Sequence, residues 1–414
     1  MRLARWLFPA LCAVLLLAGC NQQQDEEIEV KPVTITPGIA TAEPAASTDA
    51  AVDPAVAYDG TRVHLVYSQW DGASQYNLMY TQRIGAGSFT APASIFPAST
   101  GDSLNADVFL DSAGTLHIVW AEGTSPNREI YYATRTAGGT LTTPQPLTST
   151  SEDEANPRVH VDSTGRVHVV WEGSTSPPNP TTSIFYRRTQ GSVFLSAVVL
   201  PKGSGNQPAE MPDICTDQGD RIYVVWAESN GTSRDIRMVR SDDNGQNFGG
   251  VGSGFAATGS VDMTQPRVQG GLDGEVFLVF VGQDTGGDRG LFATYTRTGG
   301  TFAGPGQLLT SSTGGIRDPE IAVYRRPDDN FTVMALCNDG GSVGGNVVVF
   351  ASHDNGDNWP GDPVNLSQGN SQPSTAVTPV LALDDNELVA CWAGQPTGGG
   401  TVTTWTSNND YSLP

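Results

Sequence analysis

A short pattern recurs seven times between residue 53 and the C-terminal end, and this repetition constrains the fold more than any other feature of the sequence. Each copy holds an aliphatic residue inside a strand-like run, and successive copies are 51 to 60 residues apart. Self-similarity with a period of about 40–50 residues is typical of propellers, in which each repeat is one small sheet. The seven aliphatic positions are Val56, Val108, Val159, Ile214, Val268, Ile321 and Leu381.

Each repeat holds about four short runs of β-forming residues. Hairpin signals such as Asp59-Gly60 and Asp273-Gly274 separate the first run from the second. A large side chain that can fill the space between stacked sheets ends the second run. These large residues are Tyr67, Trp120, Trp171, Trp226, Phe280, Leu336 and Trp392. We therefore expect an all-β fold, a seven-bladed β-propeller of four-stranded blades that start near residues 53, 105, 156, 211, 265, 318 and 378.

The last repeat is shorter than the others. It has a third run at residues 401–406, after which the sequence ends. Residues 29–36, which read EVKPVTIT, resemble the fourth run of other repeats. Because an unpaired sheet edge invites aggregation, we expect this segment to close the ring by completing the last blade. Residues 29–414 would then form a single propeller domain.

The N-terminal twenty residues have the pattern of an export signal. Arg2 and Arg5 precede an apolar stretch at residues 7–17, which is too short for a membrane span. The segment ends in Leu-Ala-Gly-Cys at Cys20, which resembles the lipobox of bacterial lipoproteins. This resemblance implies that Cys20 is lipidated, that residues 21–28 are a polar tether and that the protein is anchored by lipid in the bacterial cell envelope, at the outer membrane or cell surface. The alternative is an ordinary signal peptide with an incidental cysteine.

Charge and cysteine content exclude several classes of partner and scaffold. The formal net charge of −22 disfavours binding to nucleic acid or to an anionic lipid surface. Cys215, Cys337 and Cys391 are widely separated and lie in apolar runs, so they indicate buried thiols rather than a disulfide framework. A Cys337–Cys391 bridge is the alternative.

Two turn segments carry a family resemblance. One contains Ser241, Asp243, Gly245 and Phe248, and the other contains Ser352, Asp354, Gly356 and Trp359. Both resemble the Asp box, Ser-x-Asp-x-Gly-x-x-aromatic, which is the BNR repeat of sialidases and related propellers. The resemblance implies a sialidase-like propeller in which the boxes are structural, because their aspartate accepts backbone N–H groups within the turn. It identifies a fold and not a reaction.

One aligned position of the repeat predicts a charged ring. The residue before each repeated aliphatic is, in order, Ala55, Asp107, Arg158, Asp213, Arg267, Glu320 and Val380. Two residues earlier the set is mostly polar, namely Asp53, Asn105, Asn156, Met211, Gln265, Asp318 and Thr378. If the first strand of each blade lines the channel, these side chains meet at its mouth. They would form a pocket for a small anionic or sugar-like ligand, with Arg158, Arg267 and Arg317 holding a carboxylate, or a ring of mutually neutralised ion pairs.

The catalytic set that the resemblance implies is incomplete. A sialidase needs three arginines, a tyrosine nucleophile paired with a glutamate, and an acid/base aspartate, yet residues 53–58 contain no arginine. Arg158 and Arg267 belong to the repeat consensus. Paired carboxyl groups among Asp107, Asp213 and Glu320 would suit a hydrolase, but we expect the intervening arginines to keep all three ionised. We therefore assign no catalytic residue.

The remaining motifs suggest no metal or cofactor. His64, His117 and His168 share one register of the second run, but Tyr223 and Phe277 fill the same slot later, which indicates a packing role. We expect a monomeric, non-catalytic binding module for a glycan or an envelope protein. The alternatives are an exo-glycosidase of sialidase type and an envelope assembly scaffold.

Overall fold

The computed structural model describes residues 51–410 with internal gaps, and the described part is all-β. The gaps are residues 86, 98, 100, 175–180, 204, 250–251, 256–261, 273, 284–285, 301, 303–305, 313–314, 327–329, 341–344, 360–361, 368–378, 384–386 and 395–402. The described residues all belong to one compact unit. In the described part of the chain there is no helix long and apolar enough to cross a membrane.

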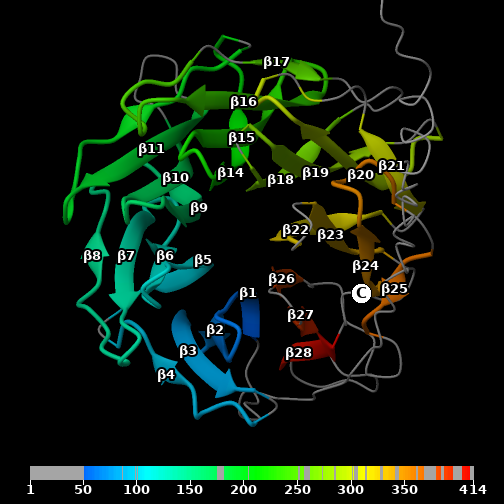
Figure 1. Cartoon of the computed structure of the whole chain (residues 1–414). Coiled ribbons are helices and arrows are strands. Elements are labelled where there is room, and N and C mark those ends of the chain that lie inside the picture. Colours follow the sequence, from blue (N-terminus) through cyan, green and yellow to red (C-terminus); the bar gives the residue numbers. More distant parts are fainter. Residues whose placement is uncertain are drawn as a thin grey trace, which may run out of the picture. The chain divides into compact units, whose positions relative to one another are not determined.

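The strands form antiparallel sheets that follow one another around a ring (Figure 1). Blade 1 contains β1 (Ala51–Tyr58), β2 (Arg62–Trp70), β3 (Tyr76–Ile84) and β4 (Ala93–Ser94). Blade 2 contains β5 (Asp102–Leu110), β6 (Leu116–Gly123), β7 (Glu129–Arg135) and β8 (Gln145–Pro146). Blade 3 contains β9 (Glu154–Val161), β10 (Val167–Ser174), β11 (Thr182–Gln190), β12 (Val193–Phe194) and β13 (Val198–Val199).

The second half of the ring repeats this order. Blade 4 contains β14 (Ala209–Thr216), β15 (Ile222–Ser229), β16 (Arg234–Ser241) and β17 (Gly252–Phe255). Blade 5 contains β18 (Thr264–Gly270), β19 (Val276–Gln283), β20 (Arg289–Thr296) and β21 (Gln307–Ser312). Blade 6 contains β22 (Arg317–Arg325), β23 (Phe331–Asn338), β24 (Val347–Ser352) and β25 (Val364–Asn365). A terminal sheet contains β26 (Val380–Leu383), β27 (Glu387–Gly394) and β28 (Thr403–Asp410).

The prediction of seven four-stranded blades is wrong. Six sheets have at least four strands, whereas the terminal sheet has three within the described residues. The repeat marks the first and second strands, but outer strands as short as Ala93–Ser94 carry no pattern, so the sequence does not reveal how many blades are complete. The proposed closing strand at 29–36 lies outside the described residues, as do the proposed signal peptide (1–20), Cys20 and the tether (21–28).

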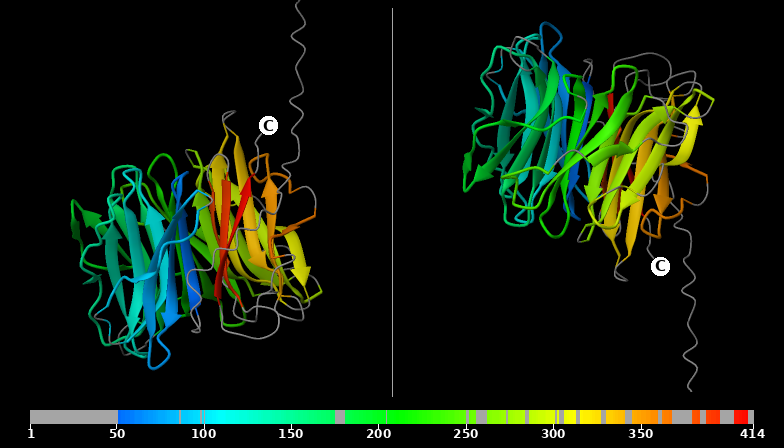
Figure 2. Two further views of the ribbon diagram at one scale, coloured as in Figure 1. Left: turned by 90° about the horizontal axis from the view of Figure 1, so that it is seen from below. Right: turned by 90° about the horizontal axis from the view of Figure 1, so that it is seen from above.

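The first strand of each sheet lies innermost and faces the axis of the ring, and the side views show the twisted sheets standing next to one another (Figure 2). The core lies between neighbouring sheets, where Trp120, Trp171 and Trp226 are fully buried. Val389 and Cys391 of β27 pack with the core of blade 1, so the terminal sheet joins the first blade. Cys215, Cys337 and Cys391 are all buried free thiols, and the alternative of a Cys337–Cys391 bridge is excluded.

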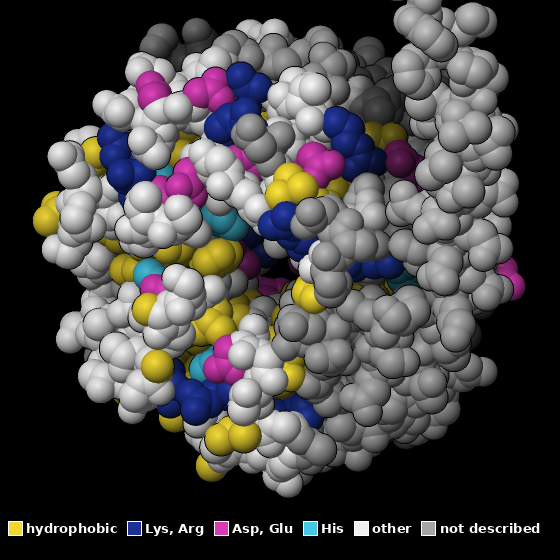
Figure 3. Space-filling model, viewed as in Figure 1, with side chains coloured by type: hydrophobic (Ala, Val, Ile, Leu, Met, Phe, Trp, Pro, Cys, Tyr) yellow, Lys and Arg dark blue, Asp and Glu magenta, His cyan; other side chains and the backbone are white. Residues whose placement is uncertain are grey.

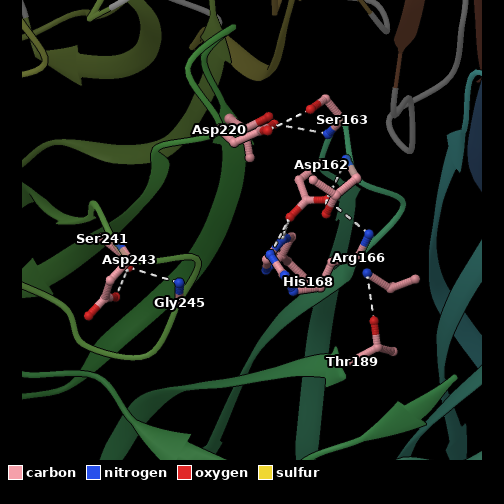
Figure 4. A network of polar contacts seen from close by, with 12 residues as sticks. Asp162, Ser163, Arg166, His168, Thr189, Asp220, Ser241, Asp243 and Gly245 are labelled. Atoms are coloured by element: carbon pink, nitrogen blue, oxygen red, sulfur yellow. Dashed lines mark hydrogen bonds and ion pairs between the residues drawn. The ribbon is translucent and has the colours of Figure 1, made fainter. Parts of the chain in front are cut away.

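Blades 1 to 3 share a buried chain of aspartate, histidine and tyrosine. In blade 3, the Nε2 atom of His168 lies 3.1 Å from the carboxylate of Asp162 (Figure 4). The Nδ1 atom of His168 lies 2.7 Å from the hydroxyl of Tyr186. The equivalent pairs are His64 with Tyr80 at 2.8 Å and His117 with Tyr132 at 2.7 Å. Each ring therefore links strands within its own blade. The described residues contain no group of three or more His, Cys, Asp or Glu side chains arranged to hold a metal ion.

The two segments that resemble Asp boxes form the turns that follow β16 and β24. Ser241 accepts the N–H of Gly245 (Figure 4). Asp243 accepts the backbone N–H groups of Gln246 at 3.0 Å and Asn247 at 2.8 Å. Gly245 has a φ of +76°, and a Cβ atom there would lie 1.8 Å from the Tyr186 hydroxyl oxygen. The turn of blade 4 therefore packs closely against Tyr186 of blade 3. In the second box Asp354 accepts the Asn358 N–H at 2.9 Å, and Gly356 donates to Ser352.

Candidate functional site

A β-bulge recurs on the innermost strands of all six blades. At each bulge the ladder register shifts and one non-glycine residue has a φ between +49° and +55°. These bulge residues are Asp53, Asn105, Asn156, Met211, Gln265 and Asp318. Asparagine and aspartate tolerate this left-handed conformation, whereas Met211 and Gln265 adopt it at a cost of about 1 kcal/mol each. The same left-handed geometry recurs in all six blades, even where Met211 and Gln265 make it costly, which indicates that this backbone conformation is needed.

The bulge residues line a cavity at one end of the channel, which we call the bulge cavity. Its volume is about 190 Å³. Besides the six bulge residues, its lining comprises Pro54, Ala106, Pro157, Arg158, Pro212, Arg267, Pro319, Glu320, Pro379 and Val380. The space-filling view shows a hollow at the centre of the ring, with side chains of both charges near it (Figure 3). The bulges thus bring polar side chains from five blades to one place, together with Met211 of blade 4.

Five of the predicted charged residues lie next to this cavity, and we call them the belt: Asp107, Arg158, Asp213, Arg267 and Glu320. Arg158 lies 3.3 Å from Asp107, and Arg267 lies 3.6 Å from Glu320. Asp213 accepts the Val268 N–H of the next blade at 2.7 Å. Asp107 does the same for Val159 at 2.8 Å. The charged groups of the belt therefore pair with each other or accept hydrogen bonds from the next blade.

The belt separates the bulge cavity from a second channel cavity of about 320 Å³. Arg158, Arg267 and Glu320 line both cavities, whereas Asp107 and Asp213 line only the second. Ala55 and Val380 occupy the corresponding positions in blade 1 and the terminal sheet, so the charged arc spans blades 2 to 6.

The expectation that all belt carboxyl groups are ionised at neutral pH is wrong for Glu320. Burial raises its pKa to about 7 against the opposing effects of Arg267 and Arg158. Burial likewise raises the pKa of Asp213 despite the same two arginines. At the bulge, burial raises the pKa of Asp318 to about 6, although Arg317 and Arg267 act in the opposite direction. The sequence could show the arginines but not the depth at which the carboxyl groups lie.

The structure also changes the list of candidate site residues. Arg317 lines neither cavity. It lies on the other side of the bulge from Glu320, because the strand register shifts between Arg317 and Glu320. The polar row that the sequence placed at the channel mouth does line the bulge cavity at Asp53, Asn105, Asn156, Met211, Gln265 and Asp318. Their common register two positions before the belt was the sequence signal. Thr378, the last member of that row, lies outside the described residues.

No tyrosine lines the bulge cavity in the part of the chain that the structure describes. Tyr58 lines the second channel cavity instead. The two arginines that do line the bulge cavity already face carboxylates of the belt. The described residues therefore do not assemble the arginine triad and tyrosine nucleophile that the sialidase resemblance implies.

Comparisons with known proteins show the fold. No family model matches the sequence, and no curated protein sequence does. A protein of unknown function from Dyadobacter fermentans superimposes with a TM-score of 0.55 at 12% identity, covering 92% of this chain and 100% of that one. The Hadza microbial sialidase Hz136 gives a TM-score of 0.54 at 12% identity, covering 79% and 73%. A polysaccharide lyase, the PL25 ulvan lyase, gives 0.58 at 11% identity, covering 90% and 95%. This chain thus has a propeller fold similar to that of these proteins.

Proposed function

We propose that this protein is a non-catalytic, glycan-binding propeller that takes one sugar residue into the bulge cavity. The observation that carries the proposal is the convergence of six bulge residues, all held in the same left-handed backbone geometry, on a single cavity. Its volume of about 190 Å³ suits one sugar ring rather than an oligosaccharide. The likeness to a sialidase and to a polysaccharide lyase supports a glycan as ligand.

The chemistry of the lining favours a neutral sugar over a carboxylated one. Asn156 already donates to Glu172 at 2.8 Å and Gln265 to Asp318 at 3.2 Å, but each amide has a second N–H that can donate to a sugar hydroxyl group. A ligand carboxylate would meet Asp53, Asp318 and Glu320, while the lining arginines already face belt carboxylates. The proline residues next to the bulges supply apolar surface for the C–H groups of a sugar ring.

The N-terminal segment extends the proposal to location. Lipidation of Cys20, which the lipobox-like tetrapeptide suggests, would tether the propeller to the bacterial cell envelope. Metabolic labelling with an alkynyl palmitate in a bacterial host tests this, and the Cys20→Ser variant should lose the label. A labelled Cys20→Ser variant would refute it.

Ligand-observed NMR with a panel of neutral and acidic monosaccharides tests the binding site. Asp318→Asn and Asn156→Asp keep side chains that tolerate the left-handed backbone but change the hydrogen bonds offered, and we expect each to weaken binding about tenfold. Asp242→Asn is the matched control, because Asp242 is exposed and pairs with Arg240 outside the channel. A preference for acidic sugars, or equal binding by all variants, would contradict the proposal.

A glycan-cleaving enzyme is the second candidate, and the state of Glu320 favours it. A carboxyl group with a pKa near 7 retains a proton at neutral pH that it can donate to a glycosidic oxygen. Incubation with aryl glycosides and uronate polymers separates the two candidates. Turnover that Glu320→Gln abolishes would replace the binding proposal, and binding without turnover supports it.

A further inference from the structure

A second feature, independent of the channel, lies on the side of blade 2 that faces blade 1. Glu122 of β6 and Glu129 of β7 stand directly opposite each other in the ladder, so their side chains share one face of the sheet. Like charges in this position destabilise an antiparallel pair. Glu122 is only 7% exposed and accepts hydrogen bonds from Ser103 at 2.6 Å and from Trp120 at 2.8 Å. One oxygen of Glu129, Oε2, is buried without a hydrogen-bond partner.

Blade 4 contains the same acidic pair with a cation beside it. Glu228 of β15 stands opposite Asp235 of β16, and Trp226 donates to Glu228 as Trp120 does to Glu122. Arg237 lies 3.8 Å from Glu228 and 3.2 Å from Asp235, so one guanidinium group neutralises both carboxylates. Blade 4 therefore shows how this fold satisfies the pair.

Blade 2 lacks that arginine. Arg237 stands opposite Trp226 in blade 4, and the residue opposite Trp120 in blade 2 is Tyr131. A cavity of about 360 Å³ opens beside the acidic pair, and we call it the blade 2 notch. Its lining comprises Phe96, Ser99, Gly101, Glu122, Gly123, Thr124, Glu129 and Tyr131, with no lysine or arginine among these described residues.

The aromatic walls of the notch suit a cation. The rings of Phe96 and Tyr131 lie 5.5 Å apart between centroids and form one wall beside the two carboxylates. Aromatic faces attract guanidinium and ammonium groups, and buried carboxylates pair with them through charge-assisted hydrogen bonds. A neutral ligand would leave the like-charged pair uncompensated.

We propose that the blade 2 notch binds a small organic cation with a guanidinium or ammonium head group, which occupies the place that Arg237 fills in blade 4. The site differs from the bulge cavity in position and in ligand chemistry. Burial and the nearby Asp102 raise the pKa of Glu122, so protons compete with the cation at this carboxylate and the affinity should rise with pH.

Isothermal titration calorimetry with ethylguanidinium tests the proposal, with ethylurea as its neutral isostere and ethylammonium for the other head group. We expect saturable binding of one or both cations and none of ethylurea. Glu122→Gln should weaken cation binding at least tenfold. Glu228→Gln is the matched control, because it alters the equivalent glutamate of blade 4 and should leave the affinity unchanged.

Tyr131→Arg keeps the test decisive if Glu122→Gln fails to fold, because it supplies the missing internal cation. We expect this variant to lose cation binding and to have a higher thermal midpoint than the wild type. Equal binding of ethylurea, no binding of either cation, or unchanged cation binding by Tyr131→Arg would overturn the proposal. Asp318→Asn, which tests the sugar site, should leave cation binding intact, so the two proposals fail separately.

Discussion

Replacing Gly245 by alanine tests how strongly the turn after β16 holds blade 4 to blade 3. Two costs follow from the structure. Gly245 has a φ of +76°, where an L-residue costs about 1 kcal/mol. The added Cβ atom would also lie 1.8 Å from the hydroxyl oxygen of Tyr186, which is only 1% exposed and cannot swing into solvent.

Displacing Tyr186 has consequences for its own contacts. Its hydroxyl lies 2.7 Å from His168, and its ring packs edge-on against Phe248 with centroids 4.8 Å apart. Losing the hydrogen bond costs about 1 kcal/mol, and repacking a crowded core costs about 1–3 kcal/mol. We therefore expect Gly245→Ala to lower the free energy of unfolding by about 3–5 kcal/mol.

Gly165→Ala is the matched control, since Gly165 has a φ of +77° but no atom within 4 Å of its added Cβ. It should cost only the backbone term of about 1 kcal/mol. Equilibrium denaturation followed by tryptophan fluorescence measures both variants. Equal losses for Gly245→Ala and Gly165→Ala would show that the contact with Tyr186 carries no energy and would refute the reasoning.

Three further predictions concern Glu320 and Met211 of the channel and the buried His64. Because the pKa of Glu320 is raised to about 7, its contribution to stability is fully present below about pH 4.5 and is lost as pH rises through 7. Glu320→Gln should therefore flatten the fall in stability between these values, and an unchanged pH profile of the thermal midpoint would contradict this. Burial lowers the pKa of His64 to about 4, so the wild type should lose stability as pH falls from 6.5 towards 4, and His64→Phe should reduce that loss in the same scan. Met211→Asn should stabilise the fold by about 0.5–1 kcal/mol in chemical denaturation, because asparagine tolerates a φ of +55° better than methionine, and a destabilised variant would show that the Met211 side chain outweighs this strain.

The sequence predicted the inner half of each blade better than the outer half. Strict periodicity fixes the first two strands, because a one-residue slip would turn residues such as Val159 and Trp171 away from the core. Outer strands of two residues, such as Gln145–Pro146, have no alternation that could reveal them. The number of complete blades depends on these strands, which is why the prediction of seven was wrong.

The charged belt was predictable and the bulge above it was not. Asp107, Arg158 and Glu320 occupy one register, and the structure brings that register together around the channel. A positive φ at Met211 or Gln265 leaves no trace in residue type, because neither residue favours it. The blade 2 notch was also hidden, since it depends on which residues stand opposite each other across two strands and on the substitution of Tyr131 for an arginine.

The belt and the bulge occupy neighbouring positions of the same inner strands. Asp107 and Asp213 accept backbone N–H groups of the following blade, so truncating either should weaken the ring itself. The bulge residues vary in chemistry from blade to blade, as in Asp53, Met211 and Gln265, although all share one backbone conformation. A position with fixed geometry and variable chemistry is suited to setting ligand specificity. Two bulge residues also hold the scaffold, because Asp53 accepts the N–H of Asn105 at 3.1 Å and Gln265 accepts that of Asp318 at 3.2 Å in the following blade. Substitutions in the belt, at Asp53 or at Gln265 should therefore change the unfolding midpoint.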